Sequence, residues 1–133
     1  MQSKPVLTVQ ELTRRLEAAR AEAAQHQWPV AISVVDDGAH PLALLRLDGC
    51  APIGAYIATE KARTAALGQR QSKHYEDMIN GGLTAFLSAP LAGTLEGGVP
   101  VVVGGQVIRA VGVSGVKGDQ DAQVAKAGAA SIV

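Results

Sequence analysis

Two pairs of β-rich segments, each joined by a short turn sequence, constrain the fold of this chain most strongly. Residues 30–35 and 42–47 flank an Asp-Asp-Gly sequence, and residues 101–103 and 106–113 flank a Gly-Gly sequence. Asp-Gly and Gly-Gly are typical of tight hairpin turns because these residues adopt positive φ at little cost. The sequence therefore predicts two hairpins and an antiparallel sheet, not a parallel sheet built from β-α-β units.

The remaining segments have the spacing of amphipathic helices. Apolar residues recur at helical intervals over residues 9–26, 53–68, 72–79 and 119–130. Thr8 and Glu11 form a capping box ahead of the first helix, and Ser72 and Asp119 are expected to cap the third and fourth. The predicted order is α-β-β-α-α-β-β-α. It describes an α+β fold with a central antiparallel β-sheet and helices packed on it, as a single domain over residues 1–133.

Charge and hydropathy narrow the range of partners. Twelve basic and twelve acidic residues give a formal net charge of zero, so no basic stripe favours nucleic acid. No apolar run approaches the length of a membrane span, and the polar N-terminus does not have the pattern of a secretory signal. We therefore expect a cytoplasmic protein without membrane contact. A neutral surface does little to oppose self-association.

Two basic side chains could meet a ligand. Lys61 lies in an Ala-rich helix, where a desolvated amine can bind a carboxylate or act as a base. Alternatively, Lys61 is solvated and paired with Glu60 or Asp48. Arg46 lies between leucines in a strand; it either points inward toward a carboxylate or is a surface charge.

The glycine-rich turns offer a second set of candidates. Backbone amides at Gly97, Gly98 and Gly115 could bind an anion, although tight turning is the more common use of glycine. The sequence around Ser114 lacks the spacing of a serine nucleophile elbow, which leaves a positioned hydroxyl as its role. Because these turns flank one hairpin, we expect their amides to converge on a pocket near Lys61.

The histidines show no metal-ligand spacing, and no metal site is predicted. A haem iron would need a histidine, Cys50 or a tyrosine as its axial ligand. His26, at the end of the first helix, and His74, after the second, are better candidates than His40, which precedes a proline in a turn.

Five segments, in this order, resemble the GlcG/HbpS-like family: residues 31–38, 46–49, 61–65, 97–100 and 112–121. The resemblance covers nearly the whole chain. It implies an α+β fold and homo-oligomers, often octamers. Members include haem-binding proteins and the C-terminal domain of PduO-type proteins, and other relatives occur in catabolic pathways.

Two functions follow as hypotheses. The first is a small-ligand-binding domain that holds haem or a related tetrapyrrole, with ligand contacts from His26, His74, Gly97, Gly98, Gly115 and Asp121. The second is a cofactor-free enzyme of hydrolase or tautomerase type that acts on a small carboxylate or enol through Lys61, Arg46 and Ser114. A pure scaffold is a third alternative.

Overall fold

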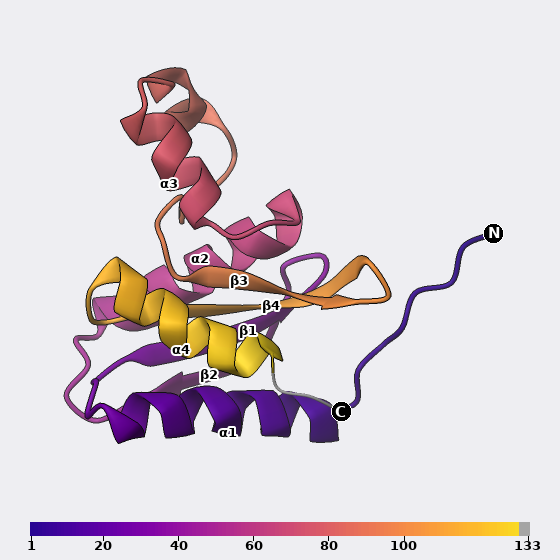
Figure 1. Ribbon diagram of the computed structural model, residues 1–133, viewed down its shortest axis with the longest axis vertical. Coiled ribbons are helices and arrows are strands. Elements are labelled where there is room, and N and C mark those ends of the chain that lie inside the picture. The colour runs from indigo at the N-terminus through magenta and orange to yellow at the C-terminus, as the bar shows by residue number, and fades with distance from the viewer. Residues whose placement is uncertain (131–133) are drawn as a thin grey trace.

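A four-stranded antiparallel sheet with strand order β2-β1-β4-β3 organises the computed structural model, which describes residues 1–130 (Figure 1). The predicted α+β order is confirmed, and a short 3₁₀ helix is added between α3 and β3. The elements are α1 (Val9–Gln25), β1 (Ala31–Asp36), β2 (Pro41–Arg46), α2 (Ile53–Gly68), α3 (Lys73–Asn80), η1 (Thr84–Ser88), β3 (Gly98–Val103), β4 (Gln106–Ser114) and α4 (Gly118–Ala130).

Side chains of the central strands alternate between two helical layers. On β1, Ile32 and Val34 pack with small residues of α1 and α4, whereas Val35 packs with alanines of α2. This alternation follows from the two-residue period of a strand. Helix α2 therefore covers one face of the sheet, and α1 and α4 cover the other (Figure 1).

Glycine and alanine bring α2 very close to the sheet. A Cβ atom at Gly112 would overlap the Ala58 carbonyl oxygen, and one at Gly98 would overlap the carbonyl oxygen of Lys61. The core consequently contains mostly alanine and valine, as the aromatic content of 3% requires.

Two β-bulges interrupt the ladders. Leu42 has no partner in the β1–β2 register, and Ile108 has none in the β3–β4 register. A bulge adds one residue to a strand and re-aims its side chain. Leu42 and Ile108 therefore depart from the simple alternation of their strands.

The helix ends correct two predictions. The Thr8 hydroxyl accepts a hydrogen bond from the Glu11 amide at 3.3 Å, so the Thr8 half of the capping box is confirmed, whereas the Glu11 carboxylate accepts from Arg14 at 2.9 Å. Ser72 does not cap α3 through its side chain; its buried Oγ donates to Leu95 O and accepts from the Gly98 amide. Helix α4 already begins at Gly118, so Asp119 lies in its first turn and is not its cap.

Helix α3 and η1 project from the sheet as an arm (Figure 1). No residue of α3 is buried, and Tyr75 stacks on Phe86 of η1 with ring centroids 4.9 Å apart. Among residues 1–130, no helix combines the length and hydropathy that crossing a membrane requires. The cytoplasmic location stays a prediction.

Candidate ligand-binding groove

Lys61 and Asp121 form a buried ion pair. Lys61 Nζ lies 3.0 Å from Asp121 Oδ2 and also donates to Val113 O at 2.9 Å. The second Asp121 oxygen accepts from the Val116 amide at 3.1 Å. Burial raises the pKa of the Asp121 carboxyl, and the Lys61 ammonium and the Val116 amide partly offset this rise. The pair connects α2, β4 and α4.

This geometry decides between the alternatives for Lys61. Lys61 is only 4% exposed, so the alternative of a solvated Lys61 paired with Glu60 or Asp48 is wrong. The general-base role requires an amine that reaches substrate, whereas this ammonium is surrounded by protein. The structure therefore does not favour the enzyme hypothesis.

The glycine-rich turns lie close to this ion pair, as expected, but the space between them is filled. A Cβ atom at Gly97 would lie 2.8 Å from Lys61 Nζ and 2.7 Å from Val113 O. The Gly98 amide already donates to Ser72. Gly115, at φ +146°, adopts a conformation that favours glycine and packs against the Pro29 carbonyl. Lys61 thus occupies the pocket expected here.

Ser114 and the two candidate histidines lie in different surroundings. Ser114 ends β4 and is 8% exposed. His26 stacks on Trp28 with ring centroids 4.3 Å apart, and its Nε2 lies 3.2 Å from a Glu22 oxygen. His74, on the projecting arm, contacts Arg70. The structure therefore places His26 and His74 on separate elements, and neither touches the Lys61–Asp121 pair.

Arg46 lies in an open apolar groove of about 500 Å³ between β2 and α2. The groove is lined by Leu44, Arg46, Pro52, Ala55, Tyr56, Thr59 and Glu60. Leu44 and Arg46 point to the same side because they lie two residues apart on β2. Tyr56 and Thr59 share a helix face because they are three residues apart on α2.

Some polar side chains of the groove already have a partner within the protein, and others do not. The Thr59 hydroxyl donates within the protein, to Ala55 O at 2.9 Å, and Glu60 pairs with Arg63 at 3.5 Å. Within the described part of the chain, Arg46 forms no ion pair. Tyr56 is 77% exposed. The groove therefore combines apolar walls with a guanidinium and a phenol that face solvent.

Sequence reasoning identified Arg46 but missed Tyr56 and Leu44. In the structure, exposed residues alternate along β2, and Leu44 and Arg46 are both on the exposed side. Strand β2 is therefore an edge strand with an exposed apolar side chain beside Arg46. Exposed apolar surface of this kind marks binding sites in many proteins.

The fold and the groove define a small α+β domain with an open, mostly apolar groove at one edge of its sheet. This chain belongs to the HbpS-like family: residues 7–130 match the family described as haem degrading protein HbpS-like. The resemblance found in the sequence is confirmed.

Individual relatives agree with this assignment. The protein GlcG of Escherichia coli K12 is 60% identical over 114 residues, which cover 86% of this chain and 85% of GlcG. The crystal structure of a double mutant of HbpS from Streptomyces reticuli superposes with a TM-score of 0.87 at 30% identity, covering 98% of this chain and 89% of that one. The PduOC–haem complex superposes with a TM-score of 0.85 at 27% identity, covering 96% of each chain.

Proposed function

We propose that this protein is a haem-binding domain that holds the porphyrin in the groove between β2 and α2. The observation that carries the proposal is the groove itself. Its volume of about 500 Å³ falls within the range of roughly 300–1,000 Å³ that is usual for small-molecule and cofactor sites. Its walls are mainly apolar, as a porphyrin face requires, and the solved relative PduOC holds haem.

Two side chains of the groove match the polar parts of haem. The unpaired Arg46 guanidinium would bind a propionate, for which its planar donors are well suited. The exposed Tyr56 hydroxyl would supply an axial oxygen ligand, as tyrosine does in some haem proteins. Neither His26 nor His74 lines the groove. Haem iron, when bound, would supply redox and oxygen chemistry that this chain lacks.

A haemin titration of the full chain tests both assignments. Tyr56→Phe should change the position of the Soret band and the ligand-to-iron charge-transfer bands, because it removes the ligand oxygen but keeps the ring. Arg46→Ala should weaken haem binding about ten-fold or more, the usual effect of losing a charge-assisted hydrogen bond.

His26→Ala and His74→Ala are the matched controls and should leave the haem spectrum unchanged. If either control abolishes the spectrum while Tyr56→Phe does not, the axial ligand is a histidine and the groove assignment is wrong. If the wild type shows no saturable Soret shift, the proposed function itself is wrong.

We also propose that the domain assembles as a homo-oligomer, for which an octamer is the specific expectation. Ile53 and Leu67 of α2 are 62% and 48% exposed, so this helix offers apolar surface that a second copy of the chain could cover. Sedimentation equilibrium should give a mass several times 13.6 kDa. A single species of 13.6 kDa at micromolar concentration would contradict it.

A further inference from the structure

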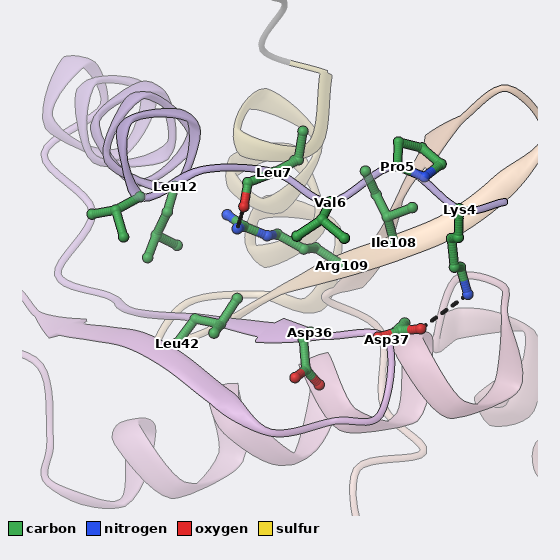
Figure 2. A pocket seen from close by; sticks show the side chains of 11 residues that line it. Lys4, Pro5, Val6, Leu7, Leu12, Asp36, Asp37, Leu42, Ile108 and Arg109 are labelled. Atoms are coloured by element: carbon green, nitrogen blue, oxygen red, sulfur yellow. Dashed lines mark hydrogen bonds and ion pairs between the residues drawn. The ribbon is translucent and has the colours of Figure 1, made fainter.

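A second cavity, separate from the haem groove, lies beneath the N-terminal segment. It has a volume of about 380 Å³ and is bounded by residues 4–7, the start of α1, the end of β1, and parts of β2 and β4. Figure 2 shows the N-terminal segment crossing over Ile108 and Arg109 of β4. The Lys4 ammonium lies 3.0 Å from an Asp37 oxygen, so an ion pair links the N-terminal segment to the residue that follows β1.

The buried guanidinium of Arg109 is the chemical feature of this cavity. Arg109 is 7% exposed, and its Nη2 donates to the Leu7 carbonyl at 2.5 Å. Its Nη1 has no hydrogen-bond partner, and no carboxylate of the described chain forms an ion pair with this side chain. Burial lowers the pKa of Arg109, and the charges of Asp36 and Glu11, which form no ion pair with it, offset this decrease only in part. A buried charge that is only partly compensated is costly, so this position favours an anion.

A second buried arginine, Arg15, lies near Arg109. Arg15 is 3% exposed, binds only backbone carbonyls of α4, and has a partnerless Nε. Burial lowers the pKa of Arg15, the Glu11 carboxylate partly offsets this decrease, and the nearby Arg109 guanidinium lowers the pKa again by a smaller amount. The acidic residues of the cavity are already engaged: Asp36 accepts from the Gly38 and His40 amides, and Asp37 pairs with Lys4.

The rest of the lining is apolar and depends on the two β-bulges. Leu42 and Ile108, the unpaired residues of those bulges, both line the cavity, together with Leu12 of α1 (Figure 2). Bulges commonly re-aim side chains next to functional sites. Both irregularities of the sheet therefore supply walls to the same space.

We infer that this cavity binds a small aliphatic carboxylate, whose charged end meets the Arg109 guanidinium and whose chain packs between Leu12, Leu42 and Ile108. The volume is near the lower end for small-molecule sites, which suits a ligand of a few carbons. An inorganic anion would satisfy the guanidinium but would leave the apolar walls unused. The inference does not rest on haem binding.

Backbone-amide NMR titrations of the full chain test the inference with butyrate, hexanoate, hexanol and inorganic phosphate. Two extra buried methylenes should make hexanoate bind about fifteen-fold more tightly than butyrate. Shifts should concentrate on residues 4–12 and 107–109. Equal binding of hexanol and hexanoate, or an affinity independent of chain length, would overturn the inference. So would phosphate binding more tightly than hexanoate.

Two variants locate the site. Arg109→Met should weaken hexanoate binding about ten-fold or more, since it removes the charged donor. Leu42→Asp changes a partly exposed wall residue, so folding should be retained, and its carboxylate should repel the ligand. Leu44→Asp is the matched control on the other face of β2.

The controls also separate this site from the haem groove. Leu42→Asp should lose hexanoate and keep haem, whereas Leu44→Asp should lose haem and keep hexanoate. Loss of hexanoate binding in Leu44→Asp, or its retention in both Leu42→Asp and Arg109→Met, would show that the carboxylate does not occupy this cavity.

Discussion

Replacing Lys61 with methionine should destabilise the fold strongly, because it leaves the Asp121 carboxylate buried without its counter-charge. Asp121 is 2% exposed, and only the Val116 amide would remain as a hydrogen-bond partner. Removing one member of a buried ion pair typically costs about 3–5 kcal/mol. That is a large part of the roughly 5–15 kcal/mol that stabilises most domains.

Urea unfolding followed by circular dichroism at pH 8 measures this cost. The double variant Lys61→Met/Asp121→Leu removes both charges and should be more stable than Lys61→Met alone, since no isolated charge remains. If the double variant loses as much as the two single variants combined, the ion pair contributes nothing as a pair. A loss below about 1 kcal/mol in Lys61→Met would refute the reasoning as well, because such a loss is typical of a surface pair.

The unfolding free energy that Lys61→Met loses should increase as pH rises. Burial raises the native pKa of Asp121, and loss of the ammonium raises it further, whereas the unfolded chain has a pKa of about 3.9. Between these two values the native state holds a proton that the unfolded state has released. The free energy of unfolding therefore falls as pH rises, and the variant should be closer to wild type at pH 5 than at pH 8. An equal loss of unfolding free energy at pH 5 and at pH 8 would contradict a buried, charged Asp121.

Three smaller effects can be measured on the same protein. Gly112→Ala should cost about 1–3 kcal/mol in urea unfolding, because its Cβ would overlap the Ala58 carbonyl; a neutral result would mean that α2 shifts freely. Thr8→Ala should cost about 1 kcal/mol through the lost cap, whereas Thr13→Ala, in the same helix but away from the cap, should cost less. Burial raises the pKa of the Cys50 thiol, so a disulfide reagent should label it much more slowly in native than in urea-unfolded protein; equal rates would contradict its burial.

Local pattern was sufficient to predict the fold. Periods of two and of about four residues, with Asp-Gly and Gly-Gly turns, predicted the four α-helices and the four strands, and β1 and β2 each lie one residue away from their predicted bounds. The 3₁₀ helix η1 was not predicted, and β3 begins at Gly98, three residues before its predicted start. The bulges at Leu42 and Ile108 were not predicted, because an extra residue in a strand leaves the composition of that strand unchanged. Yet these bulges aim two of the apolar walls of the second cavity.

The Lys61–Asp121 pair shows why the site was harder to predict than the fold. A single lysine among alanines fits a helix edge or a buried partner equally well. Its partner lies 60 residues away, on α4, so no local pattern links the two. The sequence therefore indicated that Lys61 and the glycine-rich turns would meet, and it could not indicate that the lysine would fill the space between them.

Arg46 and Arg109 lie at different positions in the sheet, and this difference explains why we propose a different ligand for each. Both are arginines in strands rich in aliphatic residues, so sequence pattern alone does not distinguish them. Arg46 lies on the edge strand β2 and faces solvent, where it keeps its hydration and suits a large ligand that remains partly exposed. Arg109 lies on the inner strand β4 with one nitrogen unsatisfied, so it gains most from a small anion that enters and replaces lost water. Position in the sheet, more than residue type, is thus the reason for proposing a different ligand for each guanidinium.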